Sequence, residues 1–123
     1  MMLKNLAYAV GAVFVLVGVL GFIPSFTPDG KLLGLFEVSP LHNIIHLLSG
    51  VAAFAMAMMG EKNTKLYFQV FGVVYALVTV VGFIQGSTVL GLIGVNMADN
   101  MLHLLLAVVL LYAGFGMNAK TEA

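Results

Sequence analysis

Residues 66–84 read LYFQVFGVVYALVTVVGFI, a run of 19 positions without a charged side chain. Three further apolar runs cover residues 6–23, 41–59 and 97–117, and only the last contains a charged residue, Asp99. A helix rises about 1.5 Å per residue and needs roughly 20 residues to cross a 30 Å hydrocarbon core, so each run is long enough to span a bilayer. Backbone groups in lipid must hydrogen-bond to one another, and four long runs achieve this as helices. The runs therefore predict an all-α, integral membrane four-helix bundle.

The composition excludes several classes of protein. The chain has 123 residues, of which 62% are hydrophobic and 8% charged, and five lysines balance five acidic residues. A soluble domain carries about 25% charged residues, so a water-soluble globule is excluded. Zero net charge argues against a nucleic-acid-binding domain, and the absence of cysteine excludes a disulfide scaffold. The predicted partners are the lipid bilayer and either a second copy of the chain or another membrane protein.

The lysines predict an orientation. Lys4, Lys62, Lys65 and Lys120 fall on one side of the predicted membrane, and Lys31 falls on the other. Because positively charged residues stay on the cytoplasmic side, both termini and the turn between the second and third runs are expected in the cytoplasm. The two remaining loops are then expected to face outward.

The chain contains the same pattern twice. Residues 34–48 (GLFEVSPLHNIIHLL) align with residues 91–105 (GLIGVNMADNMLHLL), and seven of the 15 aligned positions are identical. Each copy holds two spans, so both copies have the same orientation in the membrane. This predicts a single domain over 1–123 that is built from two tandem helix hairpins, about 4–60 and 65–117. A pseudo-two-fold axis along the membrane normal would relate them.

Four polar span residues are identical in the two copies, Asn43 with Asn100 and His46 with His103. Polar groups inside a membrane are costly and normally face the bundle interior. On each span the Asn and the His share one helix face with small residues. These are Gly50, Ala53 and Ala57 on the second span and Ala107 and Gly114 on the fourth. We expect the two stripes to face each other across the axis, with His and Asn hydrogen-bonding between helices.

Start signals precede the second and fourth runs. Ser39 is a favourable N-cap followed by Pro40, and Asn96 is a favourable N-cap with Asp99 three residues later. His42 occupies the position that matches Asp99 in the repeat. One interpretation is therefore that His42 and Asp99 are first-turn residues in contact with headgroups and water.

A second interpretation is a ligand site. His42 and His46 are spaced i, i+4, as are Asp99 and His103, so each pair lies on one helix face. Together they offer three imidazoles and a carboxylate, a set suited to Zn²⁺ or another divalent ion. The polar residues that could orient these ligands are Asn43, Asn100 and Glu37. Alternatively, His46 and His103 alone could bind a haem as axial ligands from opposite sides.

These patterns leave three functional hypotheses. The sequence has no Ser/His/Asp set, phosphate-binding loop or carboxylate pair suited to catalysis, so it gives no indication of an enzyme. The leading hypothesis is a structural or accessory membrane module, organised by a His/Asn polar cluster in the outer leaflet. The first alternative is a metal- or haem-binding redox or sensing protein that uses His46 and His103. The second is a small transporter, suggested by the parallel repeat alone.

The repeated pattern also resembles a known family. Residues 33–46 (LGLFEVSPLHNIIH) and 90–103 (LGLIGVNMADNMLH) resemble the small bacterial four-span membrane proteins grouped as domain of unknown function 4383. The resemblance covers nearly the whole chain. It implies a location in the bacterial cytoplasmic membrane and four helices. It implies no activity and supplies no site residues.

The predicted orientation can be tested with single cysteines, because the natural chain has none. Asn118→Cys and Gly30→Cys are expected to react with a membrane-impermeant maleimide from opposite sides of the membrane. Labelling of both positions from the same side would contradict the orientation predicted from the lysines.

Overall fold

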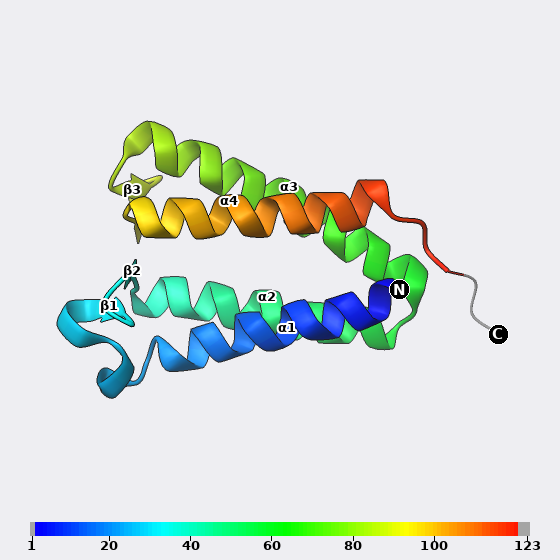
Figure 1. Cartoon of the computed structure of the whole chain (residues 1–123), viewed down its shortest axis with the longest axis horizontal. Coiled ribbons are helices and arrows are strands. Elements are labelled where there is room, and N and C mark those ends of the chain that lie inside the picture. Colours follow the sequence, from blue (N-terminus) through cyan, green and yellow to red (C-terminus); the bar gives the residue numbers. More distant parts are fainter. Residues whose placement is uncertain (1, 121–123) are drawn as a thin grey trace.

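The computed structural model describes residues 2–120, and most of them lie in four long helices (Figure 1). Each helix is long and apolar enough to cross a membrane. Their bounds are Leu3–Leu20 for α1, Pro40–Met58 for α2, Glu61–Gln85 for α3 and Met97–Leu111 for α4, which continues as a π-helical turn, η3, over Tyr112–Gly116. The chain is therefore a mostly helical, four-span membrane protein, as the apolar runs predicted.

Both predicted helix starts are confirmed. Ser39 Oγ accepts a hydrogen bond from the backbone N–H of His42 at 3.2 Å, and Pro40 is the first residue of α2. At the start of α4, Asn96 Oδ1 accepts from the Asp99 N–H at 2.9 Å, and Asp99 Oδ2 accepts from the Asn96 N–H at 3.0 Å. These bonds satisfy backbone donors that the helix itself cannot pair.

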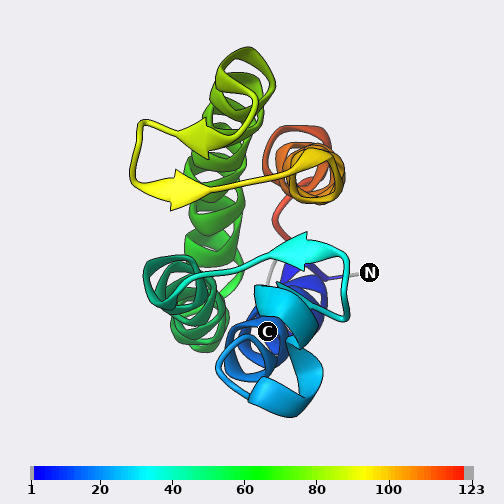
Figure 2. The ribbon, with the colours of Figure 1, turned by 90° about the vertical axis from the view of Figure 1, so that its left-hand side faces the viewer.

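The helices pack as two hairpins. α1 packs along α2, and α3 packs along α4, while contact between the hairpins is made mainly by α2 with α3. Seen along the bundle, α2 and α4 lie at opposite corners (Figure 2). The two chain ends and the α2–α3 turn lie at one end, called here the terminal end (Figure 1). The α1–α2 and α3–α4 loops lie at the other end, called here the loop end.

Glycines allow close contact within each hairpin. A Cβ added at Gly50 would lie 2.8 Å from the Gly11 carbonyl oxygen, and one added at Gly114 would lie 2.6 Å from the Gln69 backbone nitrogen. Gly50 therefore faces α1, and Gly114 faces α3. The prediction that these two glycines face each other across the axis is wrong. Periodicity identified the buried face of each helix correctly, but the nearest backbone belongs to the same hairpin.

Each loop at the loop end contains a short antiparallel hairpin, so the all-α prediction is incomplete. β1 (Lys31–Leu32) pairs with β2 (Phe36–Glu37), and β3 (Thr88–Val89) pairs with β4 (Ile93–Gly94). In the first loop the short helices η1 (Pro24–Phe26) and η2 (Pro28–Gly30) precede β1.

The two turns have the same geometry. Leu33 and Gly34 in the first turn have φ of 56° and 73°, and Leu90 and Gly91 in the second have 54° and 70°. Positive φ at both central positions is the geometry of the tight hairpin turns that match strand twist. Leucine is uncommon there, which is why the repeated Leu-Gly-Leu did not predict a turn.

One buried carboxylate joins three segments at the terminal end. Glu61 Oε1 accepts from the backbone N–H groups of Leu3 and Lys120, each at 3.0 Å, and Oε2 accepts from that of Lys4 at 2.7 Å. The side chain of Met2, the residue before α1, forms no capping hydrogen bond with this helix. Glu61 therefore places a negative charge at the start of α1, where the helix dipole favours it.

Close packing at Gly50 predicts a large effect of bulk there. Gly50→Leu is expected to lower the free energy of unfolding in detergent micelles by about 1–3 kcal/mol, because the added side chain must push α1 away. Ala55→Leu on the same helix is the control, since Ala55 is exposed on the bundle surface. Equal stability of the two variants would contradict the close α1–α2 contact.

Candidate metal-binding site

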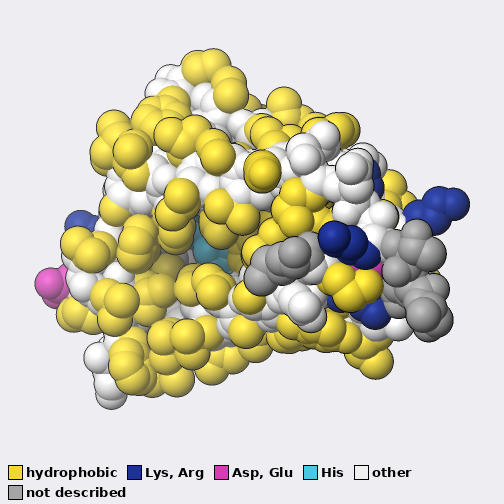
Figure 3. Space-filling view, turned by 45° about the vertical axis from the view of Figure 1, so that its right-hand side comes forward, with side chains coloured by type: hydrophobic (Ala, Val, Ile, Leu, Met, Phe, Trp, Pro, Cys, Tyr) yellow, Lys and Arg dark blue, Asp and Glu magenta, His cyan; other side chains and the backbone are white. Residues whose placement is uncertain are grey.

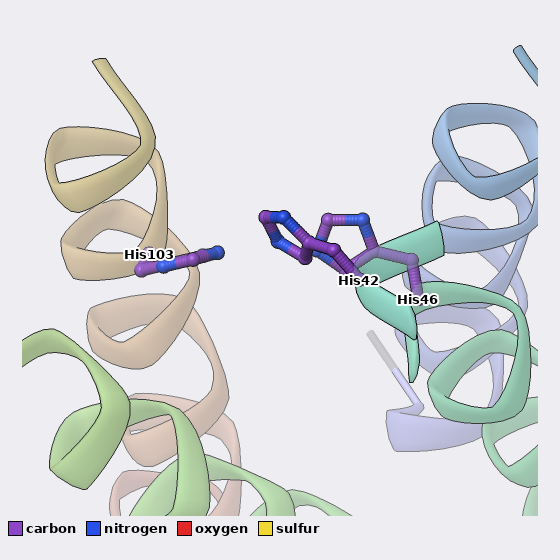
Figure 4. A group of neighbouring side chains, drawn as sticks. All are labelled: His42, His46 and His103. Atoms are coloured by element: carbon purple, nitrogen blue, oxygen red, sulfur yellow. The ribbon is translucent and has the colours of Figure 1, made fainter. Parts of the chain in front are cut away.

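Three histidines from two helices meet in the centre of the bundle. His42 and His46 extend from α2 towards His103 on α4 (Figure 4). One ring nitrogen from each residue can be chosen so that the three atoms lie within 4.8 Å of one another. The ring centroids are 4.4 Å apart for His42–His46, 5.4 Å for His42–His103 and 6.1 Å for His46–His103. The prediction that these imidazoles meet inside the bundle is confirmed.

The spacing along the chain explains this arrangement. His42 and His46 are one turn apart on α2, so both rings project from the same face. His103 lies on α4, at the opposite corner of the bundle (Figure 2). Because α2 and α4 lie at opposite corners, side chains that point inwards from these two helices meet in the same central space. The rings therefore come from different hairpins and join the two halves of the chain.

The histidine rings are buried without partners for most of their nitrogens. His42, His46 and His103 are between 2% and 4% exposed. Within residues 2–120, both ring nitrogens of His42 and of His46, and Nδ1 of His103, form no hydrogen bond of normal geometry, although the Glu37 backbone lies near the His42 ring. A buried polar group without a partner costs about 1–3 kcal/mol. Such groups are rare in native structures, and a bound ion or water is one common explanation.

Aromatic rings and hydroxyls border the histidines. The ring of Phe14 lies 5.9 Å from that of His46, and the ring of Tyr75 lies 6.0 Å from that of His103, measured between centroids. Ser49 Oγ donates to the Ile45 carbonyl at 2.8 Å and lies 2.9 Å from the Tyr75 hydroxyl. Because the single Ser49 proton is already used, Tyr75 is the donor in the second bond.

A cavity of about 180 Å³ adjoins the three rings. Its walls come from α2, α3, α4 and β4, and apart from the histidines and the two hydroxyl residues they are apolar. The apolar wall residues are Ile45, Phe71, Val74, Val78 and Ile93. On the opposite face of the bundle, between α1 and α4, a histidine is visible at the bottom of a second hollow surrounded by hydrophobic side chains (Figure 3). The histidine layer, formed by His42, His46 and His103, is therefore accessible from the side of the bundle.

Asp99 lies apart from the group of three histidines that could hold a metal ion. Its side chain is 2% exposed, and Oδ2 accepts from the Glu37 and Asn96 backbone N–H groups, each at 3.0 Å. The Asn96 amide in turn donates to the Leu35 carbonyl at 2.8 Å. Asp99 thus caps α4 and ties it to β2 of the other hairpin. His42 and Asp99 do lie in the first turns of α2 and α4, but each is only 2% exposed, so the interpretation that they contact headgroups and water is wrong.

The two asparagines lie inside their own hairpins. Asn100 Nδ2 donates to the Gly82 carbonyl on α3 at 3.3 Å, and a Cβ added at Gly82 would overlap Asn100 Oδ1. A Cβ added at Gly21, the residue that follows α1, would likewise overlap Asn43 Oδ1. The expected hydrogen bonding of Asn across the axis between the hairpins is therefore wrong. The expected hydrogen bonding of His46 is wrong as well, because neither of its ring nitrogens has a partner in the part of the chain that the structure describes. The predicted polar cluster divides into a histidine layer and separate contacts at the helix starts.

Phe14, Ser49 and Tyr75 border the histidines but were not among the predicted site residues. Ser49 lies three residues after His46, so the periodicity of α2 already placed it on the same face. Tyr75 is a tyrosine in the middle of a span, where a buried hydroxyl needs a partner, and this was an available signal. The nearness of Phe14 to His46 depends on how α1 packs against α2, which the sequence pattern does not specify.

A protein-family model described as domain of unknown function (DUF4383) matches residues 4–116. The chain belongs to the DUF4383 family. The match confirms the resemblance seen in the repeated segments at 33–46 and 90–103. Comparisons of this DUF4383 protein with curated proteins and with solved structures found no match.

The missing hydrogen bonds predict an unusual effect of an apolar substitution. In metal-free protein, His46→Phe is expected to leave the free energy of unfolding unchanged or to raise it, because removing an unpaired polar group costs nothing. The adjoining cavity has room for the larger ring. Asn100→Ala, which removes a hydrogen bond, is expected to lower this free energy by about 0.5–1.5 kcal/mol. A loss above about 1 kcal/mol in His46→Phe would instead indicate that the histidine stabilises the bundle directly.

Proposed function

We propose that this DUF4383 protein binds one divalent transition-metal ion, of the Zn²⁺ class, through His42, His46 and His103. The observation that carries the proposal is the group of three buried imidazoles, drawn from two hairpins, whose nitrogens mostly lack other partners. Neutral imidazole nitrogen is a common ligand for zinc, copper, iron and nickel. The function is then metal sensing or handling inside the membrane.

The spacing of the rings is compatible with such an ion. At a Zn–N distance of about 2.0–2.1 Å, tetrahedral ligand atoms lie roughly 3.3 Å apart. The three nitrogens lie within 4.8 Å of one another, so modest side-chain rotations would bring them onto an ion. Three protein ligands leave a fourth position open, which is the arrangement of zinc sites that bind an exchangeable ligand.

The geometry favours a single ion over haem. The His42 ring lies 4.4 Å from that of His46 and 5.4 Å from that of His103, so it stands close to both proposed axial ligands. The adjoining cavity, about 180 Å³, is smaller than the roughly 300–1,000 Å³ of typical cofactor pockets. A macrocycle would require the two hairpins to separate.

We further propose that the protein lies in a bacterial cytoplasmic membrane with both termini in the cytoplasm. Lys62 and Lys65 follow the α2–α3 turn, and Lys4 and Lys120 flank the outermost spans. These four lysines belong to the terminal end, whereas Lys31 belongs to the loop end. Positive residues favour the cytoplasmic side, so the histidine layer would lie in the outer half of the membrane.

Metal binding is tested on untagged protein purified without chelator. We expect about one metal ion per chain by elemental analysis, and absorption bands of tetrahedral Co²⁺ when metal-free protein is titrated with cobalt. His46→Ala and His103→Ala should each weaken Co²⁺ binding by more than about 100-fold, beyond the 10–100-fold typical of outer-shell changes. Asn100→Ala is the control and should retain binding.

Other outcomes would support the alternatives. A Soret band in the purified protein would support haem. Protein without metal, whose spectrum does not change when cobalt is added, would leave the histidines as part of a structural or accessory module.

A further inference from the structure

The cavity beside the histidines has a polar end and an apolar body. The histidines form one part of its wall, and most of the remainder is aliphatic or aromatic. Ser49 and Tyr75 contribute hydroxyls, but their protons are used in the bonds to the Ile45 carbonyl and to Ser49 Oγ. Neither hydroxyl therefore offers a donor to a bound molecule. Polar recognition in the cavity is concentrated where the imidazoles lie.

The volume of the cavity limits the size of an occupant. At about 180 Å³, it slightly exceeds the apolar cavity of roughly 150 Å³ that, in an engineered protein, stays dry and binds benzene. One six-membered ring or a short branched chain would fill it. Water would find few hydrogen-bond partners along the apolar walls, so an apolar occupant is favoured over water.

The cavity is bordered by helix surfaces that face lipid. Val74, on its wall, is 46% exposed on the surface of α3, and Val78 and Ile45 are partly exposed beside it. Ile93 of β4 forms the wall towards the loop end. A molecule that enters between α2 and α3 therefore comes from the acyl chains. Because charged groups are costly at this depth, it must be neutral.

We propose that this cavity binds a small, neutral, lipid-soluble molecule with a single donor atom, which occupies the fourth coordination position of the metal. The proposal rests on the metal site proposed above. The apolar body of the ligand fills the space between α2 and α3, and its donor atom points towards His42, His46 and His103. The bilayer supplies the ligand, and the histidine-bound ion selects molecules that carry a lone pair.

The test uses the full chain loaded with Co²⁺ in lipid nanodiscs, with pyridine as the probe and benzene as the probe without a donor atom. Pyridine is expected to shift the visible bands of bound Co²⁺ saturably, and benzene is expected to compete with it without shifting the bands. Val78→Phe fills the cavity and should weaken pyridine binding more than 10-fold while Co²⁺ binding is retained.

Val80→Phe is the matched control, because Val80 lies on the same helix, is 54% exposed and does not line the cavity. It should retain both Co²⁺ and pyridine binding. Val74→Phe is the second cavity variant, used if Val78→Phe fails to bind Co²⁺. Failure of the natural chain to bind Co²⁺ would overturn the metal site and this proposal together. Normal Co²⁺ binding with no pyridine response, or with an equal response in a cavity variant, would overturn this proposal alone.

Discussion

Close backbone contact within each hairpin determines the rest of this structure. Gly11 and Gly50 bring α1 and α2 together, and Gly114, in the η3 turn that continues α4, packs against α3. The contact between hairpins is different, because the rings of the histidines, Phe14 and Tyr75 occupy the space between them. Rings on opposite helices cannot fill that space completely, and a cavity is left beside them. Small residues inside each hairpin therefore allow tight packing there, and large rings between the hairpins leave the packing looser.

The two halves of the chain have similar architecture but contribute different chemistry. Asn43 and Asn100 pack on equivalent glycines, and the two β-hairpins have equivalent turns. At the next polar position, however, the first half has His42 and the second half has Asp99. His42 joins the central ring cluster, whereas Asp99 binds backbone donors of α4 and β2. One half thus supplies two of the three rings, and the other supplies one ring and the carboxylate that ties the halves together.

Much of this fold could be predicted from sequence, because each span is determined by its own residues. The four apolar runs, the caps at Ser39 and Asn96 and the inward direction of His46 and His103 all depend on local pattern. What could not be predicted depends on which helices become neighbours. Periodicity shows that Gly50 is buried, but it does not indicate whether α1 or α4 covers it. The triple hydrogen bonding of Glu61 likewise requires three distant segments to meet.

The leucines at the two hairpin turns connect backbone strain to the environment of the protein. A left-handed backbone costs a leucine roughly 1–2 kcal/mol, and Leu33 and Leu90 both adopt it. Their side chains are 60% and 67% exposed, so the protein itself offers them little contact. Transfer of a leucine side chain from water into an apolar medium contributes about 1.5–3 kcal/mol, enough to offset that strain. Immersion of these side chains in lipid would therefore offset the strain of both turns, and the thickness of the surrounding leaflet would then influence their shape.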